Sequence, residues 1–201
     1  KLPQLDFLDR QMSDLDQILS AVVASKKYRT VCVDTGRRIA EHELARSKGN
    51  LRAATKATKR RLHQVYGAFE QGFEYDDAYR HLEAAYRAGS DAEIKTACRR
   101  ILGLHSSTRE RLIILDGFYQ AIFVITGQPG SILDLGCGLN PLTVPWMGLS
   151  PATRYSALDI DADRVRFLNR YLVLAGFEPL ARCQDILTHA PDEEADLALL
   201  L

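Results

Sequence analysis

The chain has 201 residues, of which 46% are hydrophobic and 26% are charged, and its formal net charge at pH 7 is zero. These are ordinary values for a soluble protein of one or two domains with a sizeable core. No apolar run is as long as a membrane span and no signal-peptide pattern opens the chain, so we expect a cytoplasmic protein with no membrane partner. The four cysteines form no Cys-x-x-Cys pair and no metal spacing with the five histidines, which predicts reduced thiols and no bound metal.

The zero net charge conceals a segregation along the chain. Residues 26–65 contain 12 Lys or Arg and only 3 Asp or Glu, whereas residues 131–201 contain 5 Lys or Arg and 10 Asp or Glu. Such an asymmetry suggests an acidic partner for the basic part. We therefore expect the N-terminal region to bind the partner and the chemistry to lie elsewhere.

Helical periodicity dominates the first third of the chain. Apolar residues three and four positions apart predict an amphipathic helix within residues 1–25, followed by a basic turn at 26–29. Asp34 or Thr35 can cap a second helix, which should end at Gly49.

A third helix is predicted from about Leu51 to Tyr66. Its basic residues recur at helical spacing on one face. A solvated surface is the usual explanation of such a pattern, but no acidic residue in this helix balances the charge. We therefore favour an electrostatic footprint for phosphate groups. The residues on this face are Arg52, Lys56, Lys59 and Arg60.

Two shorter helices should follow, one capped by Asp76 and Asp77 and ending at Gly89, the other capped by Ser90 and Asp91 and ending near Gly103. Nothing in residues 1–104 has a strand pattern. We expect a helical domain over 1–104, with a basic subdomain at 1–66 and a second subdomain at 67–104, before a domain at 105–201.

Ser107 and Glu110 have the spacing of a capping box, which predicts one long helix up to Gly127. The simplest interpretation of this segment is a well-capped helix. Alternatively, Arg109 lies beside the first predicted strand, where it could bind a carboxylate of a ligand.

A glycine corner follows at 131–138, where a strand-like run meets Asp134 and then Gly-x-Gly. Asn140 can cap a helix there, and Pro141 can occupy its first turn. A dinucleotide fingerprint needs a third Gly where Pro141 stands. The Asp-Leu-Gly-Cys-Gly sequence instead resembles the first motif of class I S-adenosylmethionine-dependent methyltransferases. A structural domain without a ligand is the alternative.

A second strand, 154–159, ends in an acid 21 residues beyond Gly138, close to the spacing expected for a ribose-binding residue. Asp161 or Asp163 should open the next helix, and strands at 181–183 and 195–201 complete an alternation typical of a parallel, doubly wound α/β sheet. Because the last run is an apolar strand of a half-built sheet, we expect the natural protein to continue and to supply further strands.

Four segments together resemble one known family, the aminoglycoside-resistance 16S rRNA (guanine-N7) methyltransferases, over almost the whole chain. They are residues 26–30 (KKYRT), 58–69 (TKRRLHQVYGAF), 105–111 (HSSTRER) and 133–142 (LDLGCGLNPL). The resemblance implies a Rossmann-like class I methyltransferase domain behind an all-helical N-terminal domain. It further implies methylation of N7 of guanine 1405 in the decoding site of 16S rRNA, with S-adenosyl-L-methionine as the cofactor.

The resemblance also assigns residues to the cofactor. Arg109 would hold the methionine carboxylate, Asp159 would take the ribose, and Asp185 with Ile186 would flank the adenine. The remaining residues of this predicted set are His105, Thr108, Gly136, Cys137, Gly138, Ile160 and Leu199.

The partner implied is 16S rRNA within the 30S ribosomal subunit, bound by a monomeric enzyme. The residues expected to contact the RNA lie in the basic turn and in the third helix. They are Lys26, Lys27, Arg29, Arg52, Lys56, Lys59, Arg60 and Arg61.

Guanine N7 is a lone pair in the plane of the base and carries no proton, so we expect positioning without a catalytic general base. Cys137 and Cys183 are more simply structural than nucleophiles of cytosine methylation. Three alternatives remain: an adenine-N1 rRNA methyltransferase of the same resistance type, a small-molecule methyltransferase, and a catalytically silent RNA-binding protein.

Overall fold

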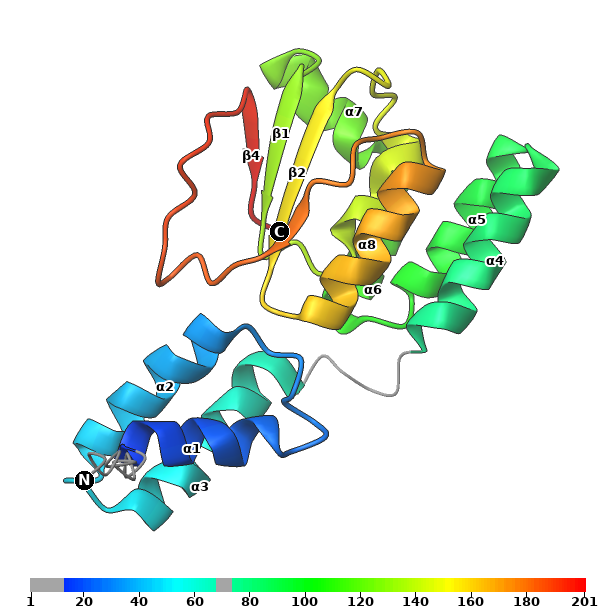
Figure 1. Ribbon diagram of the computed structural model, residues 1–201. Helices are drawn as coiled ribbons and strands as arrows, with labels where there is room; N and C mark the ends of the chain where they lie inside the picture. Colours follow the sequence, from blue (N-terminus) through cyan, green and yellow to red (C-terminus); the bar gives the residue numbers. More distant parts are fainter. Residues whose placement is uncertain (1–12, 68–73) are drawn as a thin grey trace, which may run out of the picture.

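The computed structural model describes residues 13–67 and 74–201 (Figure 1). Three helices come first: α1 (Asp14–Val23), α2 (Val33–Arg46) and α3 (Leu51–Leu62). We call them the N-terminal helical group. Their apolar faces bury small clusters of their own, one around Ile18 and one around Leu62. The prediction of helices in this region is confirmed for the described residues, whereas predictions for residues 1–12 and most of the joint after Gly67 lie outside them.

Helix α2 starts earlier than predicted. Its N-cap is Cys32, so neither Asp34 nor Thr35 caps it, and Asp34 lies in the first turn. The reason is an anchor outside the helix: the backbone N–H of Cys32 donates to the carbonyl of Ile160 at 2.7 Å. This bond holds Cys32 in an extended conformation and fixes where the helix begins.

The third helix also differs from its prediction at the C-terminal end. After Leu62 the chain widens into a π-helical turn, η1 (His63–Gly67). The Tyr66 hydroxyl lies 2.8 Å from Thr30 Oγ1, and Tyr66 is buried. Single π turns occur often at functional sites, and this one brings Tyr66 to the junction between the helices and the sheet.

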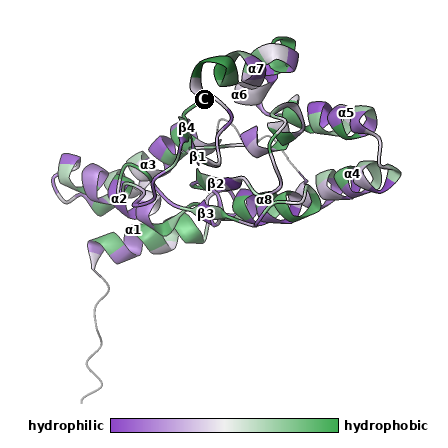
Figure 2. Cartoon of the chain, turned by 90° about the horizontal axis from the view of Figure 1, so that it is seen from above, coloured by the Kyte–Doolittle hydropathy of each residue, from purple (hydrophilic) through white to green (hydrophobic). Residues whose placement is uncertain are grey.

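Helices α4 (Tyr75–Ala88) and α5 (Asp91–Leu102) form a hairpin that packs on α8 (Ala162–Leu174). Helix α4 begins one residue before Asp76, with Glu74 as N-cap, so the predicted acidic cap lies instead in the first turn. Leu82 of α4 and Leu102 of α5 are fully buried in the same core as the sheet. Helix α8 thus lies between this hairpin and the sheet (Figure 2).

The prediction of a single long helix after Ser107 is wrong. The segment is divided into α6 (Ser106–Arg109), the 3₁₀ turn η2 (Glu110–Ile113) and α7 (Leu115–Thr126). No capping box forms, because Ser107 Oγ pairs with His105 Nδ1 at 2.9 Å. The Thr108 hydroxyl donates to the carbonyls of Leu102 and His105, which ties this turn to the end of α5.

Four parallel strands form the sheet, in the order β3-β2-β1-β4. The prediction of a parallel α/β fold is therefore confirmed. The strands are β1 (Ser131–Leu135), β2 (Arg154–Asp159), β3 (Ala181–Cys183) and β4 (Leu197–Leu199), and the 3₁₀ helix η3 (Asn140–Trp146) follows β1. Asp134 pairs with Ala157, and Asp159 pairs with Cys183. The carboxyl ends of β1, β2 and β3 consequently lie at the same edge of the sheet. They lie beside the point where the strand order changes direction, which is where parallel sheets of this kind bind ligands.

No helix of the described residues is long and apolar enough to span a membrane.

Candidate functional site

The glycine corner adopts a backbone that side chains disfavour. Gly136 and Gly138 have φ values of +61° and +53°, and a Cβ added at Gly136 would meet no atom within 4 Å. The backbone N–H of Cys137 donates to the carbonyl of Leu158 at 2.8 Å and so fixes the corner to β2. The open space beside Gly136 lets a ligand approach the main chain closely.

Asp134 and Asn140 support this corner from below. The Asp134 carboxylate accepts hydrogen bonds from Asn140 Nδ2 at 2.9 Å and from the Tyr155 hydroxyl at 2.7 Å. Burial raises the pKa of Asp134 to about 6. The prediction that Asn140 caps a helix is wrong: Leu139 is the N-cap, and the buried Asn140 amide turns inward to Asp134 and Tyr119.

Asp159, the predicted ribose residue, lies at the end of β2 and is buried. One carboxylate oxygen accepts the Gly138 N–H at 2.9 Å, and the other accepts the Asp161 N–H at 2.9 Å. Arg164 lies 3.0 and 3.1 Å from the two oxygens and is itself buried. Burial opposes the charge of Arg164, but Asp159 and Asp161 raise its pKa above the ordinary value. A carboxylate held at both oxygens therefore faces the corner.

Asp185, the predicted adenine residue, follows β3 and is likewise buried. Its Oδ2 accepts hydrogen bonds from Arg38 Nε at 3.0 Å and Nη2 at 2.8 Å, and its Oδ1 accepts the Leu187 N–H at 2.9 Å. Burial would raise the pKa of this carboxyl, but the bonds from Arg38 and Leu187 hold it below the usual value.

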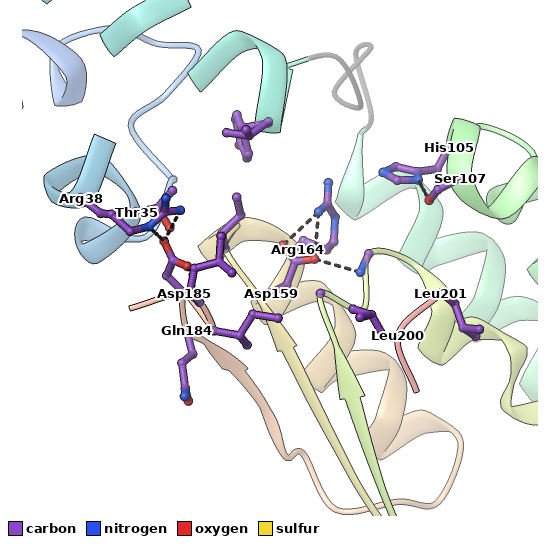
Figure 3. A pocket seen from close by; sticks show the side chains of 17 residues that line it. Thr35, Arg38, His105, Ser107, Asp159, Arg164, Gln184, Asp185, Leu200 and Leu201 are labelled. Atoms are coloured by element: carbon purple, nitrogen blue, oxygen red, sulfur yellow. Dashed lines mark hydrogen bonds and ion pairs between the residues drawn. The ribbon is translucent and has the colours of Figure 1, made fainter. Parts of the chain in front are cut away.

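His105 closes the site opposite α2 (Figure 3). Burial, together with the charge of Arg164, lowers the pKa of the imidazole to about 4. The ring is therefore neutral at pH 7, and its Nδ1 lies 2.9 Å from Ser107 Oγ.

These groups surround one cavity of about 480 Å³, a size suited to a nucleotide-like ligand. Of the predicted cofactor residues, seven line it: His105, Gly136, Gly138, Asp159, Ile160, Asp185 and Ile186. The other four do not. Thr108 is buried beside α5, Arg109 is exposed on α6, Cys137 is buried beneath the corner, and Leu199 lies in the core on β4.

Sequence reasoning missed ten lining residues: Thr35, Arg38, Val65, Tyr66, Ser107, Arg164, Gln184, Leu187, Leu200 and Leu201. Arg164 could have been found, because it lies one helical turn after the predicted cap Asp161. Thr35, Arg38, Val65 and Tyr66 belong to the N-terminal region, and no local pattern connects them to the glycine corner. The described residues contain no group of three or more His, Cys, Asp or Glu side chains able to hold a metal.

The eight predicted RNA-binding residues occupy the surface of the N-terminal helical group. All are exposed except Lys59, which is half-buried. Lys27 Nζ lies 2.9 Å from His63 Nδ1, so the basic turn and the end of α3 meet. Within residues 13–67 and 74–201, none of the eight forms an ion pair with an acidic side chain, which leaves their charge available to a partner.

Comparison with known proteins gives a consistent family match. A model of the family described as "Ribosomal RNA methyltransferase (FmrO)" matches residues 24–201. The 16S rRNA (guanine(1405)-N(7))-methyltransferase of Micromonospora rosea is 43% identical over 93% of this chain and 69% of its own length. The equivalent protein of Frankia casuarinae is 39% identical over 95% of this chain and 68% of its own.

Solved structures show the same likeness. The 16S rRNA methyltransferase RmtF in complex with S-adenosyl-L-homocysteine has a TM-score of 0.76 and 35% identity, covering 94% of this chain and 69% of that one. The 16S rRNA methylase RmtB has a TM-score of 0.73 and 32% identity, covering 92% and 70%.

Proposed function

Since the chain belongs to the FmrO family of ribosomal RNA methyltransferases, we propose that it transfers a methyl group from S-adenosylmethionine to N7 of guanine 1405 in 16S rRNA. The methylated base would then block aminoglycosides of the gentamicin and kanamycin type. The observation that carries the proposal is the pair of buried carboxylates, Asp159 and Asp185, at the ends of adjacent strands around a cavity whose floor is the glycine corner.

The cavity fits S-adenosylmethionine, which when bound supplies an electrophilic methyl group on a sulfonium centre. Asp159 would accept the ribose hydroxyls in place of part of its present contact with Arg164, which reaches both carboxylate oxygens. Asp185 would face the adenine beside Ile186. The neutral ring of His105 would not repel the positive sulfonium.

The remaining catalytic contribution would be positioning. Guanine N7 attacks with a lone pair and loses no proton, so no general base is required and the rate depends on how well the base is placed. A target inside folded rRNA must also be drawn from its stack, at a cost of a few kcal/mol. Contacts made by the N-terminal helical group would offset that cost, with the 30S subunit as the substrate and the enzyme acting as a monomer.

The decisive experiment supplies the purified protein with methyl-labelled S-adenosylmethionine and three acceptors: intact 30S subunits, naked 16S rRNA and a panel of small molecules. We expect label in the subunits, mapped by strand scission to one N7-methylated guanine at position 1405. Label on an adenine or in a small molecule would overturn the proposal.

Docking through the basic face of α3 is tested by measuring binding to 30S subunits. Lys56→Ala combined with Arg60→Ala should weaken binding to 30S subunits and reduce the salt dependence of log K by about 1 per lost phosphate contact. Affinity for S-adenosylhomocysteine should not change. Arg87→Ala, an exposed arginine on α4, is the matched control. Equal effects of the control and the double variant would argue against docking through α3.

A further inference from the structure

Arg38 crosses from the N-terminal helical group to the far end of the cofactor cavity (Figure 3). Its Nε and Nη2 both donate to one oxygen of Asp185, at 3.0 and 2.8 Å, while the Leu187 backbone N–H donates to the other oxygen. The Asp185 side chain is 3% exposed, whereas that of Arg38 is 38% exposed. The direction of this carboxylate is therefore set by a side chain from a different part of the fold.

The helical group is also fastened at the ribose end. Besides the bond from Cys32 to Ile160, the Ala162 N–H donates to the carbonyl of Thr30 at 2.9 Å. Val31 forms an isolated antiparallel bridge with Asp161. Residues 30–32 directly follow the basic turn, so the segment that carries Lys26, Lys27 and Arg29 is continuous with one that bonds to the backbone of Ile160, a residue that lines the cavity.

A third connection runs through α3. This helix carries most of the predicted RNA-binding residues and leads into η1, whose Val65 and Tyr66 line the cavity. With Thr35 and Arg38 of α2, these residues form one wall of the pocket. A shift of the helical group on its RNA would consequently move that wall.

We propose that Arg38 is a positioning residue for the cofactor, supplied by the rRNA-docking region: it orients Asp185 toward the adenine amine and couples cofactor affinity to rRNA docking. This inference rests on the proposed function. The amine of adenine donates to a carboxylate, and a carboxylate fixed in advance binds it without the cost of ordering. Because coupling is reciprocal, whatever docking adds to cofactor affinity, the cofactor adds to docking.

The first test is equilibrium binding of S-adenosylhomocysteine, which needs no turnover. Arg38→Ala should weaken binding about tenfold, as expected for the loss of a charged hydrogen bond. Arg38→Lys should recover part of that loss. Arg37→Ala removes the same charge from the neighbouring, exposed position of α2 and should bind like the wild type. Wild-type affinity in Arg38→Ala would overturn the inference, whereas no binding by the wild-type protein would overturn the proposed function itself.

The second test distinguishes a role of Arg38 in orienting Asp185 from a general role in supporting the structure of the pocket. S-inosylhomocysteine carries an exocyclic carbonyl oxygen in place of the adenine amine, and the wild type should bind it much more weakly than S-adenosylhomocysteine. In Arg38→Ala this discrimination should shrink at least threefold, because Asp185 is no longer aimed at the amine. If the variant weakens both ligands equally, Arg38 only supports the structure and the inference fails.

The third test measures the coupling. Equilibrium dialysis of labelled S-adenosylhomocysteine, with and without saturating 30S subunits, should show tighter binding in the presence of subunits for the wild type and for Arg37→Ala. The ratio should approach one in Arg38→Ala. Equal affinity with and without subunits in the wild type, or unchanged coupling in Arg38→Ala, would contradict the proposal.

Discussion

The two ends of the cofactor cavity are built in different ways. Asp159 takes its partners from the sheet and the adjoining helix: the N–H groups of Gly138 and Asp161 and the guanidinium of Arg164. Asp185 takes its charged partner, Arg38, from a helix 147 positions away in the sequence. The Asp159 end is thus completed by neighbouring chain, whereas the Asp185 end is completed only when the N-terminal helical group is in place.

Replacing each carboxylate by Ala should give the largest difference in stability between the two ends. Asp159→Ala removes the carboxylate that lies 3.0 Å from the buried Arg164, leaves Asp161 3.9 Å away, and should lower the free energy of unfolding by about 3 kcal/mol. Asp185→Ala should cost only about 1 kcal/mol, because Arg38 can turn to water. Urea unfolding followed by circular dichroism measures both values. Equal losses would erase the distinction between the two ends.

The two ends should also lose stability in different pH ranges. The pKa of His105 in the folded protein, about 4, lies below its ordinary value of about 6.5. Protonation therefore favours unfolding, and the stability contributed by neutral His105 falls as the pH drops from about 6.5 toward 4. The lowered pKa of Asp185 acts in the same direction but only below about pH 4.

Urea midpoints from pH 7.5 to 4.5 should accordingly decline less steeply in His105→Gln than in the wild type. Arg38→Ala should leave the slope in that range unchanged. Identical slopes for the wild type and His105→Gln would show that His105 does not titrate as its surroundings indicate.

A small effect should come from the hydroxyl that α4 contributes to the Asp159 end. Tyr75 donates to Asp161 Oδ2 at 3.0 Å, and Tyr75→Phe should lower the free energy of unfolding by about 1 kcal/mol. Tyr79→Phe on the same helix is the control and should change it by less than about 0.5 kcal/mol. A control effect as large as that of Tyr75→Phe would mean that the bond to Asp161 adds nothing.

Local patterns predicted the strands and most of the helices, and they selected Asp159, which lines the cavity. The strand, the glycines and Asp159 lie within one stretch of chain, and their spacing in the sequence is enough to predict that they lie close together in the fold. The helix N-termini were predicted less well. Asn140 has the chemistry of a cap, but the buried Asp134 and Tyr119 offer its amide partners inside the core, and an unsatisfied buried carboxylate would cost more than an uncapped turn.

The wall formed by α2 and η1 could not be predicted from spacing. Arg38 stands in a run of basic residues that looks like solvent-exposed surface, and only the tertiary fold brings it to Asp185. The same limit applies to the helix broken at Ile114, where Ser107 and Thr108 bond to groups that sequence periodicity does not reveal.

The sequence separation between Arg38 and Asp185 also bears on how the protein matures. The N-terminal helices make mostly local contacts with one another and can fold as soon as they are synthesised, since domains generally fold in order from the N-terminus. Their partner carboxylate is made 147 residues later. In a nascent chain the basic residues of these helices are therefore present before the cofactor pocket is, and the contact between Arg38 and Asp185 forms only after Asp185 has been made.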